Sequence, residues 1–318
     1  MRLILKIYIT VVVGTAVFLY QYVFKQLHIP VPITLNGEHD QLETIAQQIA
    51  QSGLGNTRCK RICFDSSSNS DLPPLYIITP TYRRAEQIAE LTRLAHTLML
   101  VPNVYWLVIE DASKRTPFVT QLLEDAGIRY EHLLAPMPDE YKNKKSMPKG
   151  VSNRNKGLSW IRSHATEGVL YFADDDNTYD LDIFCQMRFT KRVSMWPVGL
   201  ITKLGVSSPV VKNGVFSGFY DGWIAGRKFP VDMAGFAVSV RFLLQRPNAS
   251  MPFRAGYEED GFLRSLHPFE PNEIELLASN CSKILVWHTQ TKKNQPSQPL
   301  DVVKYGSTNI AILKQLLV

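Results

Sequence analysis

Three carboxylates in a row, Asp174, Asp175 and Asp176, come directly after the short apolar run 169–173. The run is rich in β-forming residues and predicts a buried strand. Adjacent like charges repel and raise one another's pKa, so the cluster needs either solvent or a cation. Carboxylate oxygens suit hard ions such as Mg²⁺ and Mn²⁺, and strand ends in open α/β sheets bind nucleotides. The pattern indicates a metal–diphosphate site, with a solvated acidic turn before Asn177 as the alternative.

A basic segment, residues 142–150, contains four lysines and no acid, and Arg154 and Lys156 follow it. Such a run is often only a solvated face, and nucleic-acid binding is another common use. Beside a carboxylate cluster, however, cations are what a diphosphate needs in addition to a metal. We therefore expect this segment to contact a diphosphate, and we expect no nucleic acid as a partner.

Three stretches in the C-terminal half form a second group that could do chemistry. Residues 256–263 place Glu258, Glu259 and Asp260 before a short apolar stretch, which by composition alone is the first turn of a helix stabilised by its dipole. Residues 283–289 predict a strand that ends in His288, and a lone histidine there is most often structural. Residues 229–236 predict a loop that enters a buried strand.

The elements that position these residues alternate along the chain. Strands are predicted over residues 75–79, 105–109, 128–134 and 169–173, and helices over 85–98, 117–126 and 151–163, with Pro80 ending the first strand. Short links between them imply right-handed crossovers, and therefore an α/β fold with a mostly parallel sheet. No G-x-G-x-x-G motif follows the first strand, which argues against an enzyme of hydride transfer.

Composition agrees with a well-cored globular protein. The chain has 318 residues, enough for one large domain or two small ones with appendages. Its apolar fraction is 45% and its net charge is +6. The four cysteines, Cys59, Cys63, Cys185 and Cys281, form neither a disulfide framework nor a zinc pattern, although the first two could pair locally.

The N-terminus predicts a membrane anchor. Residues 7–24 are almost wholly apolar, and as a helix they span about 27 Å, close to the hydrocarbon thickness of a bilayer. Arg2 and Lys6 precede the run, which predicts a cytosolic tail over residues 1–6 and a lumenal address for the rest. A cleaved signal peptide is the alternative, but no small-residue cleavage site follows. No second apolar run is long enough to span, so we expect one crossing.

A stem is predicted between the anchor and the folded part. Residues 25–72 include the serine-rich stretch 66–70, which cannot bury enough surface to fold. Residues 73–318 are the predicted lumenal domain. Two sequons, at Asn248 and Asn280, fit that address and are the predicted glycosylation sites.

Five stretches between Ile78 and Thr289 resemble one known family: residues 78–82, 171–179, 196–200, 229–236 and 280–289. The chain resembles the β-1,3-glucuronyltransferases (glycosyltransferase family 43), an animal Golgi family that moves glucuronic acid from UDP-glucuronate to a terminal galactose. The resemblance implies a GT-A type nucleotide-sugar transferase, with a Rossmann-like donor half over 73–177 and an acceptor half over 178–318. It also implies Mn²⁺ as cofactor, a homodimer, and a single-pass type II protein of the Golgi membrane.

The roles of the family's residues carry over by position. Glu259 resembles the catalytic base, Asp176 the Mn²⁺ ligand and Asp175 the ribose contact. The residues that resemble other nucleotide-sugar contacts are Pro80, Tyr82, Asp111, Lys149 (where an arginine is expected), Arg154, Asp174 and His288. Those that resemble acceptor contacts are Trp223, Arg227 and Asp232.

The resemblance implies a single displacement. Glu259, expected to be an ordinary carboxylate that is ionised at Golgi pH, deprotonates the acceptor's 3-hydroxyl, which attacks the anomeric carbon opposite UDP. Mn²⁺ on Asp176, together with Lys149, Arg154 and His288, stabilises the leaving diphosphate. The anomeric configuration inverts, and no covalent nucleophile is needed.

Two positions depart from the family's pattern. Gln290 stands where an arginine would help to hold the donor, and Ser207 stands where an acidic acceptor contact is expected. The first leaves open a different UDP-sugar, such as UDP-xylose. A metal-dependent phosphatase or nuclease, and a non-catalytic scaffold or lectin, are further alternatives. The acceptor stays open between the galactosyl-galactose of the proteoglycan linkage region and an N-acetyllactosamine terminus on glycoproteins or glycolipids.

Overall fold

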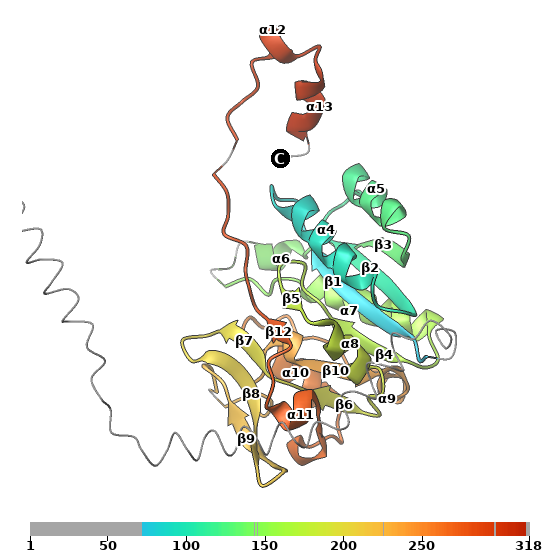
Figure 1. Ribbon diagram of the computed structural model, residues 1–318, viewed down its shortest axis with the longest axis vertical. Coiled ribbons are helices and arrows are strands. Elements are labelled where there is room, and N and C mark those ends of the chain that lie inside the picture. Colours follow the sequence, from blue (N-terminus) through green and yellow to red (C-terminus); the bar gives the residue numbers. More distant parts are fainter. Residues whose placement is uncertain (1–71, 143, 145, 225, 296, 316–318) are drawn as a thin grey trace, which may run out of the picture. The chain divides into compact units, whose positions relative to one another are not determined.

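The computed structural model describes residues 72–315 except 143, 145, 225 and 296 (Figure 1). The predicted anchor, residues 7–24, and all of the predicted stem before Leu72 lie outside these residues. Among the helices that the structure does describe, none is both long and apolar enough to cross a bilayer.

A seven-stranded sheet forms the centre of the described part, in the order β11-β6-β10-β4-β1-β2-β3. Its strands are β1 (Leu75–Thr81), β2 (Val104–Glu110), β3 (Arg129–Leu134), β4 (Val169–Phe172), β6 (Val193–Met195), β10 (Phe236–Ser239) and β11 (Glu275–Leu276). The first four run parallel, as does β11 beside β6. Only β10 runs antiparallel to both of its neighbours. The predicted α/β fold with a mostly parallel sheet is therefore confirmed.

Helices cover both faces of this sheet, because alternate strand residues point to opposite sides. On one face Ile77 and Trp106 pack with α4 (Gln87–Leu98) and α5 (Pro117–Ala126). On the other face Ile78 and Leu107 pack with α7 (Val151–His164). The right-handed links that this requires bring the carboxyl ends of β1, β2 and β4 to one edge (Figure 1).

The predicted boundary at Pro80 is wrong by two residues. β1 continues through Pro80 to Thr81. It pairs with β4 only as far as Ile78, whereas its pairing with β2 continues to Thr81. Pro80 therefore lies where β1 has a neighbour on one side only, and such edge positions tolerate a missing N–H.

A second sheet has the order β5-β12-β7-β8-β9. Its strands are β5 (Thr178–Tyr179), β12 (Val286–Trp287), β7 (Val198–Ile201), β8 (Gly205–Lys212) and β9 (Val215–Tyr220). The remaining elements are α6 (Asp139–Lys142), α8 (Leu181–Met187), η1 (Met233–Gly235), α9 (Val240–Leu244), α10 (Glu258–Ser265), η2 (Pro271–Glu273), α11 (Leu277–Cys281), α12 (Val302–Tyr305) and α13 (Asn309–Gln315). The sequence predicts the strand that ends in His288, but β12 itself has two residues and ends just before that histidine.

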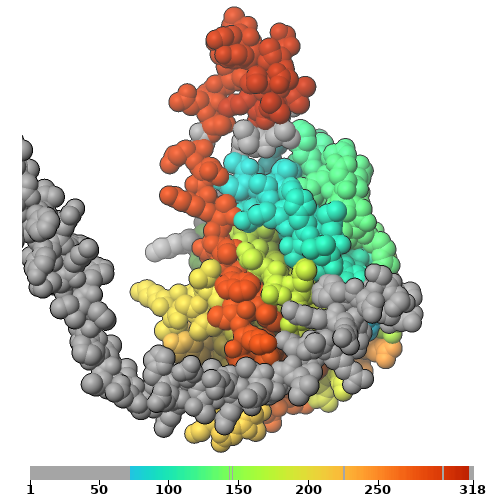
Figure 2. All heavy atoms as spheres, viewed as in Figure 1, coloured from blue at the N-terminus to red at the C-terminus, as the bar shows by residue number. Residues whose placement is uncertain are grey.

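The chain after β12 returns to the first helix of the domain. Asn294 donates to the Glu86 carboxylate from its backbone N–H at 2.6 Å and from its side chain at 2.9 Å. Figure 2 shows this C-terminal segment, in orange-red, lying along the side of the cyan α4 region.

The sequence analysis found no disulfide framework and left only a local pair of Cys59 with Cys63 open, and it gave Cys185 no partner. This residue, on α8, is disulfide-bonded, whereas Cys281 is a free thiol. The scattered spacing of the cysteines gave no local signal of this bond.

Candidate functional site

The acidic cluster lies at the carboxyl end of β4, beside the ends of β1 and β2. Asp175 is only 6% exposed, and both of its carboxylate oxygens are engaged. Its Oδ2 accepts a hydrogen bond from Thr81 Oγ1 at 2.8 Å, and its Oδ1 lies 2.7 Å from Arg84 Nη2. Burial raises the pKa of Asp175 to about 6, against the opposing effect of Arg84. Of the three acids, Asp175 is the one that is buried and has both carboxylate oxygens paired with protein side chains.

Asp174 forms an ion pair with Arg154, which is 6% exposed on the first turns of α7. The same guanidinium donates to the carbonyl of Lys149 at 3.4 Å. Gly150 permits this approach, because it has a φ of +71° and a Cβ there would lie 2.4 Å from Arg154 Nη1. The Lys149 side chain itself is exposed and meets the site only through its backbone. The basic segment thus reaches the acidic cluster through Arg154.

Asp176 differs from its two neighbours, since its carboxylate takes part in no hydrogen bond or ion pair with the residues that the structure describes. Its backbone carbonyl accepts from Thr289 Oγ1 at 2.6 Å. Burial and the charge of Asp174 raise the pKa of Asp176, which means that its ionised form lacks sufficient compensation. A hard divalent cation would supply that compensation.

The donor set fits a cation held by one protein carboxylate. In the described part of the chain, no three His, Cys, Asp or Glu side chains are arranged to hold a metal together. Magnesium and manganese sites of nucleotide enzymes commonly use one or two carboxylates, with substrate phosphates and water as the other ligands. Asp176, with its free oxygens, is therefore the residue that could hold Mn²⁺.

The predicted uridine contacts surround the same edge. Asp111 follows β2, its backbone N–H donates to Thr81 O at 2.9 Å, and its Oδ1 accepts from Met137 N at 2.7 Å. Tyr82 follows β1 and is 45% exposed, with the guanidinium carbon of Arg84 lying 4.7 Å from its ring centroid. Pro80 is half-buried in β1 opposite Ile109. An exposed aromatic ring beside carboxylates suits a nucleoside, which needs stacking and hydrogen-bond acceptors.

His288 connects the acidic cluster to the predicted acceptor residues. Its backbone N–H donates to Gly199 O at 2.9 Å, which places the ring at the edge of β7. Its Nδ1 lies 3.8 Å from Asp232 Oδ2, and its Nε2 lies 2.7 Å from Gln290 Nε2. Burial raises the pKa of Asp232, and His288 opposes this shift as it does for Asp176. One imidazole therefore acts electrostatically on both carboxylates.

Glu259 is the second residue of α10 and is half-buried. Burial raises the pKa of Glu259 to about 7, the charges of Asp232 and Glu258 add to this effect, and Arg227 opposes it. This differs from the expectation of an ordinary carboxylate, because the helix places Glu259 against other acids in a partly dehydrated site. A carboxylate with such a pKa is suited to accept a proton near neutral pH.

An aromatic and cationic surface lies beside Glu259. The Arg227 guanidinium carbon lies 4.4 Å from the ring centroid of Trp223 and 5.8 Å from that of Tyr257. Trp223 is 45% exposed and packs on Gly256, where a Cβ would lie 2.1 Å from the indole. Exposed indole rings of this kind bind the apolar faces of sugars, and guanidinium groups donate to hydroxyls.

The sequence analysis assigns no role to three residues of the site. Arg84 holds Asp175, and Thr289 holds the backbone of Asp176. Asp260 accepts from the backbone N–H groups of Lys228 and Phe229 at 2.7 and 2.8 Å, so it fixes α10 to the loop that carries Arg227. The signals that could have found them are positional: Asp260 lies within the acidic patch, and Arg84 lies shortly after the 78–82 stretch.

The two departures from the family pattern have different surroundings. Ser207 is 2% exposed on β8, opposite Val198, and its hydroxyl has no hydrogen-bond partner among the described residues. Gln290 is exposed, has a φ of +48°, and lies against His288. Both sequon asparagines, Asn248 and Asn280, are exposed.

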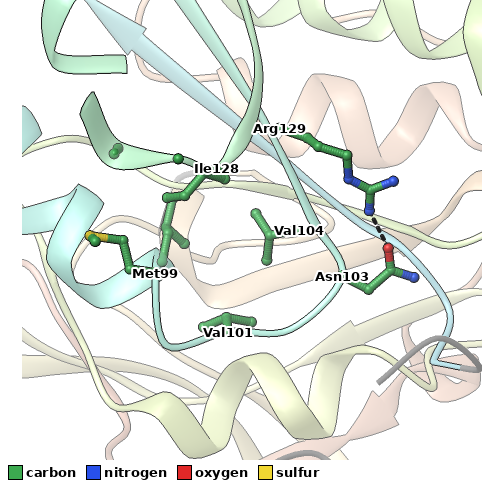
Figure 3. Close-up of a pocket in the computed structure, with 9 residues that line it drawn as sticks. Met99, Val101, Asn103, Val104, Ile128 and Arg129 are labelled. Carbon is green, nitrogen blue, oxygen red and sulfur yellow. Dashed lines mark hydrogen bonds between the residues drawn. The ribbon is translucent and has the colours of Figure 1, made fainter. Parts of the chain in front are cut away.

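A cavity of about 300 Å³ lies at the opposite, amino end of β2 and β3 (Figure 3). Most of the residues that line it have apolar side chains, and Arg129 is hydrogen-bonded to Asn103 at one side (Figure 3). None of the predicted site residues lines it, and no carboxylate or imidazole does. It is therefore not the candidate site.

Comparison with known proteins identifies relatives of the chain. A family model described as glycosyltransferase family 43 matches residues 94–292. Two Drosophila melanogaster proteins, galactosylgalactosylxylosylprotein 3-beta-glucuronosyltransferases P and S, are 65% and 53% identical over 77% and 70% of this chain. The human galactosylgalactosylxylosylprotein 3-beta-glucuronosyltransferase 2 is 46% identical over 73% of this chain and 75% of its own length.

The extent of these matches is uneven. They cover 52% and 55% of the two Drosophila proteins, so the chain spans about half the length of these curated relatives. Among solved structures, residues 1–349 of S. aureus TarS in complex with UDP are 13% identical, with a TM-score of 0.44 over 69% of this chain and 61% of that one. That likeness is too remote to carry a functional argument.

Proposed function

The chain belongs to glycosyltransferase family 43, and from this premise we propose that it is an inverting β-1,3-glucuronosyltransferase. Its donor is UDP-glucuronate, and its acceptor is the 3-hydroxyl of a terminal galactose. One observation carries the proposal: the series of neighbouring groups from Asp176 through His288 and Asp232 to Glu259. At one end of the series, Asp176 is suited to a cation that binds the diphosphate. At the other end, Glu259 is suited to accept a proton.

The donor lies, in this proposal, across the carboxyl ends of β1, β2 and β4. Pro80, Tyr82 and Asp111 contact the uridine, and Asp175 faces the ribose. Asp176 would hold Mn²⁺, which when bound compensates the charge of the diphosphate as the bond to the sugar breaks. Lys149, Arg154, Asp174 and His288 complete the diphosphate side of the site. The ion pair between Arg154 and Asp174 supports this, because it keeps the guanidinium beside the cluster.

The acceptor galactose lies on Trp223, with Arg227 and Asp232 bound to its hydroxyl groups. Glu259 accepts the proton of the 3-hydroxyl as its oxygen bonds to the anomeric carbon. The bond from that carbon to the UDP oxygen breaks, and UDP leaves with the electron pair. Attack from the face opposite UDP converts the α-linked donor into a β-linked product. The raised pKa of Glu259, about 7, supports its role as the base.

A transfer assay tests the proposal. Purified protein is incubated with Mn²⁺, UDP-glucuronate and a panel of galactose-terminated acceptors, including galactosyl-galactose and N-acetyllactosamine. The expected result is a β-1,3-linked glucuronide that does not form without acceptor or with EDTA. Transfer from UDP-xylose in preference to UDP-glucuronate would replace the donor assignment. Phosphate release without any acceptor would replace the transferase with a phosphatase or nuclease.

The cellular setting belongs to the same proposal. We expect a single-pass type II protein of the Golgi membrane that forms a homodimer. The apolar run 7–24, which lies outside the described residues, and the exposure of Asn248 and Asn280 support this address. Endoglycosidase should shift the gel mobility of the protein made in cells, and the Asn248→Gln and Asn280→Gln variants should lose that shift. Sedimentation of the purified protein would detect the dimer.

A further inference from the structure

Arg84, in the loop between β1 and α4, contacts groups of its own loop, of α4 and of the acidic cluster after β4. Its side chain is 14% exposed and forms ion pairs with Asp175 and Glu90. It also donates to the carbonyl of Tyr82 at 3.2 Å and to Thr81 Oγ1 at 3.5 Å. Its guanidinium carbon lies 4.7 Å from the ring centroid of Tyr82, within the range of a cation–π contact.

Among the described residues, Arg84 is the cation that pairs with both members of a buried acidic pair, Asp175 and Glu90. Asp175 is 6% exposed and Glu90 is 2% exposed. Arg84 Nη2 forms the ion pair with each of these two carboxylates. Burial alone would lower the pKa of Arg84, but the two carboxylates raise it above its ordinary value. The guanidinium is therefore firmly held in this position.

The geometry joins two groups that come from distant parts of the chain. Tyr82 follows β1, and Asp175 follows β4. A guanidinium is planar and has several donors, so it can hold a carboxylate with one side and lie over an aromatic ring with its face. A lysine ammonium has no such fork. The arrangement fixes the ring relative to the carboxylate before any ligand binds.

We propose that Arg84 is a positioning residue of the nucleotide-sugar site, which fixes the Tyr82 ring and the Asp175 carboxylate in the relation that a uridine requires. The inference rests on the proposed function, since it assigns uridine to these two groups. Arg84 acts through them and needs no contact with the donor. Its loss should weaken UDP binding and raise the KM for the donor, while the KM for the acceptor stays nearly unchanged.

Four variants separate this role from a structural one. Arg84→Gln removes the charge, and Arg84→Lys keeps the charge without the fork. Arg83→Gln is the matched control, because Arg83 is the exposed neighbour on the same loop. The double variant Arg84→Gln with Glu90→Gln removes one of the two buried carboxylate charges that Arg84→Gln leaves unpaired. It should therefore recover much of the thermal stability that Arg84→Gln loses.

The measurements are UDP titration calorimetry with Mn²⁺, donor and acceptor KM values, and thermal melts. We expect Arg84→Gln to weaken UDP binding by about tenfold or more, Arg84→Lys to recover only part of it, and Arg83→Gln to bind like the wild type. In the double variant, stability should return while UDP affinity stays low. If UDP affinity returned together with stability, or if Arg84→Gln raised both KM values equally, the positioning role would be overturned. Failure of the wild type itself to bind UDP would instead refute the proposed function.

Discussion

Glu259 and Asp176 are two carboxylates of one site whose surroundings give them different tasks. The carboxylate of Asp176 pairs with none of the described residues and lies near another acid, which favours a cation. Glu259 lies in a less hydrated position against Asp232, which favours the protonated form up to about pH 7. A base works best when its pKa is near the operating pH, because it is then both available and able to hold the proton. Environment, rather than residue type, separates the two roles.

The rate of transfer should depend on pH through Glu259. Its carboxylate must be ionised to accept a proton, so kcat/KM should fall as pH decreases below about 7, by about tenfold per pH unit at the acidic end. Glu259→Gln should cut kcat on the order of 10²-fold or more and leave UDP affinity nearly intact. Glu258→Gln is the control and should retain activity, with its profile moved slightly to lower pH. Equal losses in the two variants would move the base elsewhere, with Asp232 next.

Removal of the Asp176 carboxylate should abolish the Mn²⁺ dependence of UDP binding. Asp176→Ala takes away the one cluster carboxylate that no described residue occupies, while Asp174 and Asp175 keep their arginine partners. Calorimetric titration of UDP with and without Mn²⁺ measures the effect. The UDP affinity of the variant in the presence of Mn²⁺ should equal that of the wild type in EDTA. Unchanged metal dependence in the variant would show that the ion is held elsewhere.

Residue types and their order were enough to predict the acids and the histidine, but not the groups that hold them. Asp176 and Glu259 stand in short local patterns that the sequence displays directly. The ion pair between Arg84 and Asp175 joins residues that follow β1 and β4, two strands that meet only in the folded sheet, and no local pattern records it. The pKa of Glu259 depends on Asp232, which also reaches it only through the fold.

Elements are predicted best where their periodicity is regular. α5 begins and ends as the pattern predicts, with Pro117 at its start and Gly127, at a φ of +64°, after its end. The second sheet, in which β12 and β7 run parallel and the other neighbours antiparallel, was not predicted, apart from a longer strand in place of β12. Its strands β5 and β12 have two residues each, too few to show alternation, and the pairing of β12 with β5 and β7 joins distant segments.

α10 carries Glu259, and Asp260 fixes this helix to the loop before β10. Asp260→Ala would leave the N–H groups of Lys228 and Phe229 without their buried acceptor. We expect a loss of about 2–5 kcal/mol in the free energy of unfolding and a lower kcat, because Glu259 and Arg227 lose their alignment. UDP affinity should persist. Arg264→Gln, which removes only the half-exposed partner of Asp260, should cost about 1 kcal/mol or less. Chemical denaturation measures the free energy of unfolding of each variant. Steady-state kinetics at a temperature below the unfolding transitions of the wild type and the variants measures kcat.

At the scale of the molecule, the site is assembled from both ends of the folded domain. The first strand supplies Thr81 and Tyr82, and the segment after the last strand supplies His288 and Thr289. Thr289 donates to the backbone of Asp176, and Asn294 reaches Glu86 at the start of α4. The site therefore depends on the closure of the whole domain, and any constraint that stabilises the domain should also stabilise the arrangement of the site residues.

We expect the disulfide of Cys185 to be such a constraint. α8 lies in the core, where Phe184 packs on Tyr171 and Tyr179, so the cross-link acts on a buried element. A disulfide lowers the entropy of the unfolded chain, and Cys185→Ser should reduce the free energy of unfolding by about 2–5 kcal/mol. Cys281→Ser is the matched control, since this thiol is free and should cost about 1.5 kcal/mol or less.

Reduction provides the second arm of this test. Dithiothreitol should lower the Tm of the wild type and of Cys281→Ser toward that of Cys185→Ser, and should leave Cys185→Ser nearly unchanged. UDP affinity at a temperature well below both transitions should be the same in all three proteins, because Cys185 contributes no group to the site. Equal Tm values for Cys185→Ser and Cys281→Ser would mean that the cross-link does not stabilise the domain. A loss of UDP affinity in folded Cys185→Ser would instead mean that α8 helps to position the acidic cluster, which follows β4 and precedes α8 in the chain.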